Sequence, residues 1–368
     1  MRLLFSVDSI SRSRGGIESL CFNVVDALSK TEDITVLGSR EKSDIIEGID
    51  FIDGRRASSP IINFFASVLA LKDVNLSGFD AVICSTWRTA LIARLLLLMH
   101  RTPYFVLIHG NDMLNPSTRT FRTKIENMLR RNMLRNAAGV IANSNYTLNL
   151  CTSLVDEHSV TVIHPPISYC ETPPAQERPS GCLRLFSLGR LEERKGIQHV
   201  LAAIKEMLSE DPEANVIYRI GGSGPFEEEL RNTIEAFGIQ GHAEMLGRLS
   251  EEEKAWEFSW CDAFIMPSFY IPQQGSVEGF GIVFLEANMY GKPVIATASG
   301  GIPDAVIPGK TGILTEEGDV EELSRAIRAL YDGSMSFDST SCKEWAARHD
   351  ASCIAEQYKN FISSILGK

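Results

Sequence analysis

The chain has 368 residues, of which 44% are apolar and 23% are charged, so it has the composition of a globular protein and the length for two domains. Its net charge of -11 excludes a general nucleic-acid-binding protein, because such proteins need a positive surface that displaces the counterions of the phosphate backbone. The charge is unevenly spread: residues 1–170 hold 18 Lys and Arg against 16 Asp and Glu, and residues 171–368 carry a net charge of -13.

Apolar runs typical of buried strands alternate with helical patterns along the chain, which indicates parallel sheets with helices on both faces. The first half contains predicted strands at 3–7, 34–37, 81–84, 104–108, 140–142 and 160–163. The second half contains predicted strands at 183–188, 215–220, 243–246, 263–266, 294–296 and 312–314. Two such series predict an α/β protein built from two doubly wound, Rossmann-like domains.

Prolines cluster and periodicity lapses at about residues 165–182, which indicates a linker. We therefore predict an N-terminal domain at 1–170 and a C-terminal domain at 171–350. An amphipathic helix is expected in the remaining segment, 351–368, and we expect it to pack back on the N-terminal domain.

Between Ser117 and Asn136, six basic residues and one acidic residue alternate with apolar ones, which predicts a basic amphipathic helix. Two interpretations stay open: a solvated outer face over a core-facing apolar stripe, or a surface that docks on anionic lipid. The basic residues are Arg119, Arg122, Lys124, Arg130, Arg131 and Arg135, and the apolar ones are Phe121, Ile125, Met128, Leu129, Met133 and Leu134.

Neither a signal peptide nor a membrane span is expected. The N-terminal residues follow a strand pattern, and the most apolar run, at 90–99, is too short to cross a bilayer. The eight cysteines form no C-x-x-C pair, so we expect reduced core residues and no zinc site. The expected location is the cytoplasm, with peripheral membrane contact only.

Two glutamates, Glu278 and Glu286, enclose a run of seven residues that begins with Gly279 and continues into a helical pattern. The pair therefore straddles a helix N-terminus, where unpaired amides and a partial positive charge favour an anionic diphosphate. Because helical side chains lean toward the N-terminus, Glu286 can point at the same ligand.

Ligands of doubly wound sheets bind beyond the carboxyl ends of the strands. In this chain several glycines and basic residues directly follow predicted strands. Arg190 and Lys195 follow one strand and suit a pyrophosphate, although such a run is also typical of a solvated loop. Gly222 follows the next strand, but Glu227 stands where a dinucleotide fingerprint needs glycine, which argues against an NAD-dependent oxidoreductase.

The N-terminal half offers weaker candidates. Gly15 and Gly16 follow the first strand and are a possible phosphate loop or a plain turn. His109 ends another strand and is either a sugar contact or a structural residue. The segment 143–145 is interpreted as a helix cap rather than a ligand loop.

In this order, the motifs GRLEERKG, GGSGP, EGFGIVFLEA and SGGIPD resemble those of the retaining glycosyltransferases of family 4. The resemblance covers essentially the whole chain and implies the GT-B fold. The sequence around the two glutamates also resembles that of the bacterial branch that contains phosphatidylinositol mannoside mannosyltransferases and enzymes of surface polysaccharide synthesis.

The resemblance implies a role for each motif. Arg190 and Lys195 would hold the donor diphosphate, Glu278 the sugar hydroxyls and Glu286 the ribose, while His109 would lie near the transferred sugar. The implied catalytic residues are Arg190, Lys195, Glu278 and His109. The implied donor-binding residues are Gly15, Gly16, Gly222, Arg248, Leu249, Gly279, Phe280, Gly281, Ile282, Val283 and Glu286.

The resulting hypothesis is metal-independent transfer of a hexose with retention, from a nucleotide diphosphate sugar to a lipid-linked or glycan acceptor. GDP-mannose is the favoured donor and a UDP-sugar is the alternative. Two other functions stay open: a synthase-like or phosphorylase-like enzyme with a small soluble acceptor, and a non-catalytic subunit that binds a nucleotide sugar.

Overall fold

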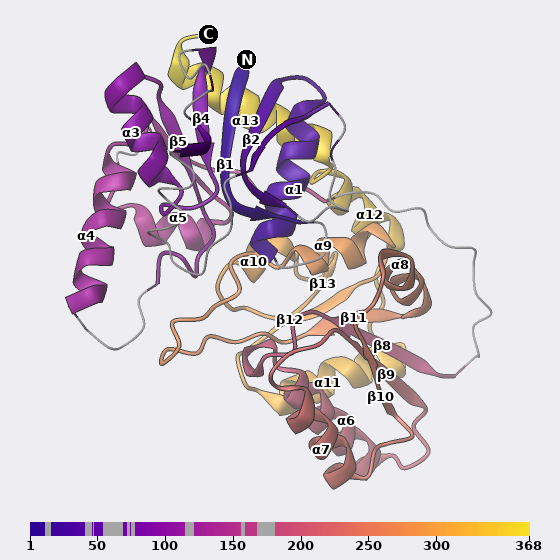
Figure 1. The fold of residues 1–368 in the computed structure, drawn as a ribbon. Coiled ribbons are helices and arrows are strands. Elements are labelled where there is room, and N and C mark those ends of the chain that lie inside the picture. Colours follow the sequence, from indigo (N-terminus) through magenta and orange to yellow (C-terminus); the bar gives the residue numbers. More distant parts are fainter. Residues whose placement is uncertain are drawn as a thin grey trace. The chain divides into compact units, whose positions relative to one another are not determined.

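A computed structural model describes residues 1–11, 16–40, 46, 48–53, 69–71, 74, 78–114, 121–155, 159–167 and 181–368. The chain divides into two compact units (Figure 1). The first unit comprises Met1–Pro166 together with Asp350–Lys368, and the second unit comprises Ile167–His349. Most of the predicted linker, residues 168–180, lies outside the described residues.

The first unit contains a parallel sheet of seven strands in the order β3-β2-β1-β4-β5-β6-β7. All six strands predicted in this half are confirmed, and β3 was missed because it has no buried residue and polar residues at both ends. The strands are β1 (Arg2–Ile10), β2 (Asp33–Arg40), β3 (Asp50–Asp53), β4 (Ala81–Cys84), β5 (Tyr104–Ile108), β6 (Gly139–Ala142) and β7 (Val160–Val162).

Helices cover both faces of this sheet. On one face α1 (Gly16–Ser29) contacts α13 (Ala351–Leu366), and Phe361 of α13 meets Phe105 of β5 edge to face, with ring centroids 6.0 Å apart. On the other face the apolar core includes residues of α3 (Ala90–His100), α4 (Phe121–Arg135) and α5 (Asn145–Cys151).

The second unit contains a parallel sheet of six strands in the order β10-β9-β8-β11-β12-β13. All six strands predicted in this half are confirmed. They are β8 (Leu183–Leu188), β9 (Val216–Gly221), β10 (Ala243–Gly247), β11 (Ala263–Met266), β12 (Val294–Thr297) and β13 (Gly312–Thr315).

Two helical layers sandwich this second sheet (Figure 1). One layer contains α6 (Ile197–Glu210), α7 (Glu227–Phe237) and α11 (Val320–Tyr331). The other contains α8 (Glu251–Trp260), α9 (Ile282–Met289), α10 (Ile302–Ala305) and α12 (Ser339–Ala347). Within the described part of the chain, no helix has the length and apolarity needed to cross a bilayer.

Candidate functional site

The loops that follow β8 and β11 meet at the carboxyl edge of the second sheet. These two strands are neighbours, and the strand order reverses between them. In doubly wound sheets such a switch point leaves a crevice beyond the strands in which ligands bind. The loop after β8 carries Arg194 and Lys195, and the loop after β11 carries Glu278. The topology therefore brings two predicted motifs together within one unit.

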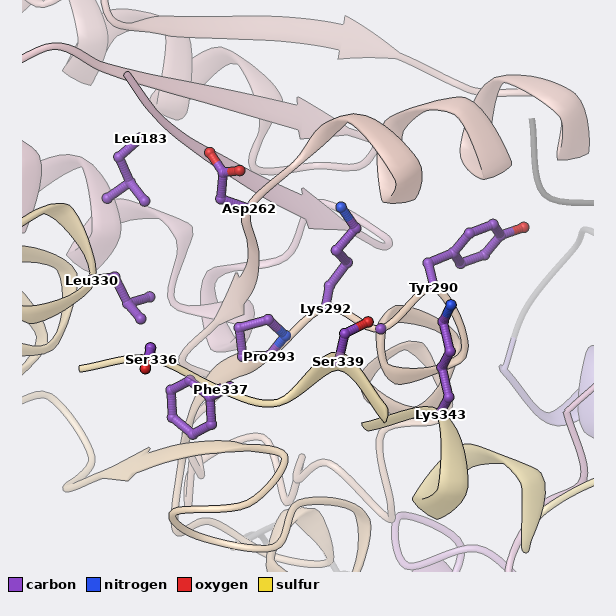
Figure 2. A pocket seen from close by; sticks show the side chains of 11 residues that line it. Leu183, Asp262, Tyr290, Lys292, Pro293, Leu330, Ser336, Phe337, Ser339 and Lys343 are labelled. Atoms are coloured by element: carbon purple, nitrogen blue, oxygen red, sulfur yellow. The ribbon is translucent and has the colours of Figure 1, made fainter. Parts of the chain in front are cut away.

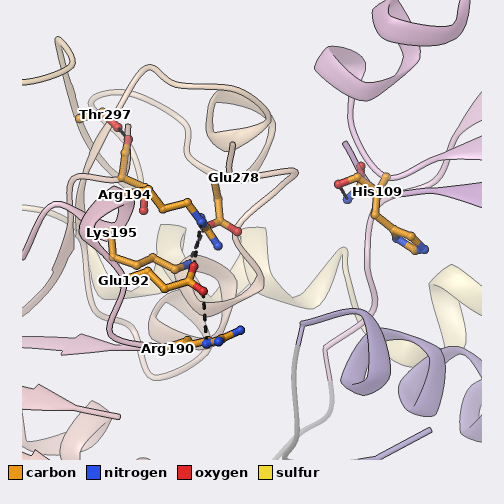
Figure 3. A network of polar contacts seen from close by, with 9 residues as sticks. His109, Arg190, Glu192, Arg194, Lys195, Glu278 and Thr297 are labelled. Carbon is orange, nitrogen blue, oxygen red and sulfur yellow. Dashed lines mark hydrogen bonds and ion pairs between the residues drawn. The ribbon is translucent and has the colours of Figure 1, made fainter. Parts of the chain in front are cut away.

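Glu278 lies at the centre of a partly buried ion cluster (Figure 3). Its Oε2 accepts hydrogen bonds from Nη1 of Arg194 at 2.9 Å and from Nζ of Lys195 at 2.5 Å. The side chains of Glu278, Arg194 and Lys195 are 15%, 13% and 10% exposed. Burial by itself raises the pKa of Glu278, but the two cations outweigh burial and lower it to about 2. Glu278 is therefore ionised at neutral pH.

A second carboxylate, Glu192, extends the cluster. It accepts from Nε of Arg194 at 3.1 Å and lies 3.2 Å from Nε of Arg190. The side chain of Arg190 is 71% exposed and forms its described ion pair with Glu192, apart from Glu278 (Figure 3). Three cations and two carboxylates leave one surplus positive charge, which favours an anionic ligand.

The sequence drew attention to Arg190 and Lys195 but missed Arg194, the second cation on Glu278. A single 3-10 turn, η3 (Glu193–Lys195), directs both Arg194 and Lys195 to that carboxylate. The only signal available in the sequence was that Arg194 adjoins Lys195, and a run of charges does not reveal which of its members a tight turn will direct inward.

The α9 N-terminus follows the Glu278 loop directly, as the spacing of the glutamates predicted. Gly279 and Phe280 are buried, and Gly281 precedes the helix. The amides of Ile282 and Val283, like those of any first helical turn, have no partner within the helix. They lie in the same loop-helix junction as Glu278, which gives the cluster backbone donors as well as side-chain cations.

Gly281 is expected to be irreplaceable at this junction. Its φ is 92°, and a Cβ there would lie 2.3 Å from the Phe284 ring. We expect Gly281→Ala to lower the free energy of unfolding by roughly 2 to 4 kcal/mol, measured by urea unfolding. Gly309→Ala is the control for backbone strain alone, because φ there is 74° and no atom lies within 4 Å. An equal loss of unfolding free energy in both variants would show that the Phe284 ring can move away from the new Cβ without destabilising the fold.

Glu286, on the second turn of α9, is partly buried and receives no hydrogen bond or ion pair from the described residues. Burial raises its pKa to about 7, with a smaller opposing influence of Lys254 and a further increase from Glu251. The carboxyl group therefore changes its charge close to physiological pH.

The raised pKa of Glu286 predicts a pH-dependent stability. The neutral carboxyl group of Glu286 stabilises the folded state below its ordinary pKa of 4.5. This stabilisation is lost as the pH rises to about 7, because ionisation of the group in its folded environment is unfavourable. Since Gln mimics the neutral form, we expect Glu286→Gln to raise the free energy of unfolding by roughly 2 to 3 kcal/mol at pH 8 and to leave it nearly unchanged at pH 4.5. Urea unfolding at both pH values tests this, with Glu235→Gln on the exposed face of α7 as the control. A gain independent of pH would contradict it.

The loops after β9 and β10 lie against the β8 loop. The Gly222 amide donates to the Gly247 carbonyl at 2.6 Å, and the Leu191 amide donates to the Ser223 carbonyl at 3.1 Å. The φ of Gly222 is 124°, and a Cβ there would lie 1.8 Å from the carbonyl oxygen of Gly189. Close contact of these loops therefore requires glycine at position 222.

The predicted nucleobase segment belongs to the same group of loops. Nε of Arg248 donates to Oγ of Ser223 at 2.8 Å. The side chain of Leu249 lies beside Gly221, since a Cβ at that glycine would come within 2.8 Å of Leu249 Cδ1. Gly222, Arg248 and Leu249 therefore lie in the same group of loops as Lys195 and Glu278.

The remaining predicted residues belong to the first unit. His109 is buried, its amide donates to Oδ1 of Asp112 at 2.9 Å, and its Nε2 lies 2.7 Å from the Ser85 carbonyl oxygen. Nε2 must therefore carry the proton, which leaves Nδ1 as a buried acceptor with no partner among the described residues. Gly16 is exposed at the start of α1, and Gly15 lies outside the described residues.

The helix cap predicted at 143–145 is confirmed. Ser144 precedes α5 with an extended backbone, and its Oγ accepts from the Thr147 amide at 3.1 Å. Its role is therefore to satisfy a backbone donor at the start of the helix.

The apolar side chains of α4 do not all face the core. Met133 and Leu134 are buried, but Phe121 and Met128 are 80% and 64% exposed, and Ile125 is exposed beside them. Lys124, Arg131 and Arg135 are exposed on the same helix, whereas Arg130 is buried and donates to the Asp112 carbonyl at 3.0 Å. Arg119 and the side chain of Arg122 lie outside what the structure describes.

A cavity of about 450 Å³ lies at the opposite, amino edge of the second sheet (Figure 2). Leu183, Asp262 and Pro293 line it at the starts of β8, β11 and β12, and Ser339 and Lys343 of α12 close it. None of the predicted site residues lines this cavity, so it is separate from the Glu278 cluster.

The described cysteines are all free, and most are buried, while Cys170 lies outside the described residues. Burial raises the pKa of the Cys342 thiol to about 11, so it carries no thiolate at neutral pH. Among the described residues, no group of three or more His, Cys, Asp and Glu side chains is placed to hold a metal ion.

Two family models match consecutive parts of the chain. The model described as Glycosyltransferase Family 4 matches residues 14–169, and the model described as Glycosyl transferases group 1 matches residues 171–348. The chain belongs to the family 4 glycosyltransferases. The Glu278 cluster lies within the group 1 match.

Solved structures agree with this assignment at the level of the fold. The Anabaena protein Alr3699/HepE, solved in complex with UDP-glucose, superimposes with a TM-score of 0.75 at 20% identity, over 99% of this chain and all of that one. The architecture of two parallel sheets, each enclosed by helices, is the GT-B fold of family 4 glycosyltransferases.

Relatives of known activity match only in part. A GDP-mannose-dependent phosphatidylinositol monomannoside mannosyltransferase of Corynebacterium glutamicum is 37% identical over 39% of this chain and 36% of its own length. A glycogen synthase of Mycobacterium tuberculosis is 31% identical over 47% of this chain and 40% of its own length. The matched segment thus spans less than half of each relative, and the two relatives act on different substrates.

Proposed function

We propose that this family 4 glycosyltransferase is a retaining enzyme that transfers mannose from GDP-mannose to a lipid-linked or glycan acceptor. The observation that carries the proposal is the Glu278 cluster, in which a partly buried carboxylate and two cations with little exposure adjoin a helix N-terminus at the switch point of the sheet. Such a site offers a partner for sugar hydroxyls and donors for a diphosphate within one loop.

In the proposed reaction the bond between the anomeric carbon and the diphosphate oxygen breaks, and its electron pair stays on the leaving phosphate. Lys195, Arg194 and the first amides of α9 stabilise the charge that grows there. The acceptor hydroxyl bonds to the anomeric carbon on the same face of the sugar, and its proton passes to the leaving phosphate. Arg190 is proposed as a further cation, since its exposed side chain can turn without breaking a buried contact.

The other roles follow the same proposal. Glu278 holds the sugar hydroxyls, Glu286 the ribose diol, and the segment of Arg248 and Leu249 the nucleobase. In this proposal the second unit binds the donor, and the first unit binds the acceptor and contributes Gly16 and His109. His109 would contact the sugar through Nδ1, the atom left without a partner among the described residues.

One experiment tests the proposal directly. The protein is incubated with GDP-mannose, UDP-glucose and UDP-N-acetylglucosamine, with and without phosphatidylinositol mannosides, and release of nucleoside diphosphate is measured. We expect release from GDP-mannose only when the lipid acceptor is present, no loss of activity in EDTA, and an α-linked product. Release that needs only a soluble sugar would favour the synthase-like alternative, and binding without release would favour a non-catalytic subunit.

The acceptor proposal rests on the exposed face of α4. Phe121 and Met128 stand in water beside Lys124, Arg131 and Arg135, a combination that suits an anionic lipid surface. A cytoplasmic enzyme bound through this face would meet its acceptor at the inner leaflet of the plasma membrane.

We expect the α4 face to mediate binding to vesicles that contain phosphatidylglycerol. The double variant Phe121→Ser and Met128→Ser should reduce vesicle co-sedimentation about tenfold or more, because two exposed apolar side chains no longer enter the lipid. Met335→Ser in the second unit removes an equally apolar exposed side chain and should have no effect. Equal binding to neutral and anionic vesicles would contradict the electrostatic part of this proposal.

A further inference from the structure

The last residue of the second unit contacts the Glu278 loop. His349 is buried, and its ring lies 6.0 Å from the Phe280 ring at an angle of 48°. Phe280 is itself 2% exposed and follows Glu278 by two residues. Ring pairs in this range of distances stabilise one another beyond the area they bury. The His349 ring therefore supports the loop that holds the carboxylate.

Trp345 fixes the orientation of His349 and supports the same loop from a second direction. Its ring meets His349 edge to face at 4.8 Å, and its carbonyl oxygen lies 3.1 Å from His349 Nδ1. Nε1 of Trp345 donates to the Ala305 carbonyl at 2.8 Å, at the end of α10. At the start of α10 the Gly301 amide donates to the Glu278 carbonyl at 2.9 Å. Glu278 is thus held on both sides by contacts that lead to α12 and His349.

His349 also links this loop to the place where the chain enters the second unit. Its carbonyl oxygen accepts from the Ile167 amide at 2.9 Å. Ile167 is the first residue of the second unit and His349 is the last. Ile167, Phe280 and Ala305 belong to one buried apolar cluster, so these contacts form a continuous part of the core.

We propose that His349 is a positioning residue for the Glu278 loop, acting through Phe280, and that occupation of the donor site is transmitted through it to the Ile167 amide. The proposal rests on the proposed function of the Glu278 cluster as a donor site. It adds a residue that touches neither the donor nor the reacting atoms. A diphosphate that orders residues 279–283 would tighten the Phe280–His349 contact and, with it, the hydrogen bond between His349 and Ile167.

Two substitutions separate the ring of His349 from its hydrogen-bonding capacity. His349→Phe keeps an aromatic ring against Phe280, whereas His349→Asn keeps an N–H donor near the Trp345 carbonyl and removes the ring. We expect His349→Asn to raise the dissociation constants of GDP and UDP about three- to tenfold by calorimetry and His349→Phe to restore them largely. In turnover assays the change should appear in the donor KM and leave kcat within about twofold, because the reacting groups are intact.

Hydrogen exchange reports the transmission itself. In the unaltered protein, the nucleoside diphosphate should slow exchange of the peptides that contain Ile167 as well as those that contain residues 279–283. In His349→Asn, the protection at Ile167 should be lost while that at 279–283 persists. His242→Asn is the matched control, because His242 Nδ1 also lies near a backbone carbonyl, that of Val216 at 2.9 Å, and its ring takes no part in the ring contacts of Phe280 and Trp345.

The outcomes distinguish this inference from the function on which it rests. If GDP and UDP fail to bind the unaltered protein, the donor site is wrongly assigned and the inference falls with it. If they bind the unaltered protein and His349→Asn equally, with equal protection at Ile167, the donor site stands and the role of His349 is refuted. A loss of binding in both His349 variants without rescue by Phe would also refute it, since ring packing would then not be the cause.

Discussion

Lys195→Ala is expected to lower kcat about 100- to 1,000-fold and to weaken binding of the nucleoside diphosphate, because its ammonium would stabilise charge that appears on the phosphate as the glycosidic bond breaks. Its position supports this result: Nζ lies 2.5 Å from Glu278, and the side chain is 10% exposed, so little solvent screens it. The measurement is release of nucleoside diphosphate from the donor that the panel identifies, at saturating donor. The fold should survive, because Arg194 continues to pair with Glu278.

Lys205→Ala, on the exposed face of α6, is the matched control and should retain full activity. Arg190→Ala and Arg194→Ala complete the series and show which arginine contributes to the reaction. A kcat within about threefold of the unaltered value for all three cation variants would refute leaving-group stabilisation by this loop.

Glu278→Gln is expected to damage both function and stability. The substitution keeps the shape of the side chain but removes the carboxylate that Arg194 and the buried Lys195 share, and such uncompensated charge is costly. Because the pKa of Glu278 is lowered from 4.5 to about 2, its stabilising contribution is present above pH 4.5 and is lost as the pH falls toward 2. We expect a loss in the free energy of unfolding on the order of 3 kcal/mol at pH 7, and a smaller difference at pH 3.

Activity should fall with stability. If Glu278 holds the sugar hydroxyls as proposed, loss of this charged hydrogen bond should lower kcat/KM about 10- to 100-fold at a temperature where the variant is still folded. Glu235→Gln, exposed on α7, should change neither quantity. A Glu278→Gln variant with unaltered stability at pH 7 would show that the two cations are solvated rather than dependent on the carboxylate.

The strands of both sheets could be predicted from the sequence because parallel strands buried on both faces are continuous apolar runs. β8 and β11 are fully buried along their length, and the predicted bounds match the observed ones. β3 has no such run, since its partly buried Phe51 and Ile52 lie between exposed aspartates. Edge strands of this kind form because a neighbouring strand offers hydrogen-bonding groups. The local sequence pattern does not indicate this pairing.

The contact between Lys195 and Glu278 was predictable, because each residue lies in the loop after a strand and the two strands are neighbours in the sheet. Arg194 was not, because its direction depends on a single 3-10 turn. His349 was missed for a different reason: its contacts with Phe280 and Trp345 depend on how α12 packs against the α9 loop, and a lone histidine carries no sequence signal. The sequence left a core-facing stripe and a lipid-docking surface open for α4, because it does not show that tertiary packing buries only the C-terminal part of the apolar stripe.

The second unit is one continuous stretch of chain, Ile167–His349, placed between the two pieces of the first. During synthesis it can therefore complete its core while the first unit still lacks α13. Until that helix emerges, the face of α1 that contacts it remains exposed to solvent. The unit that begins the chain is thus the last to be completed, and its closing step depends on Ile354, Tyr358 and Ile362 near the end of the chain.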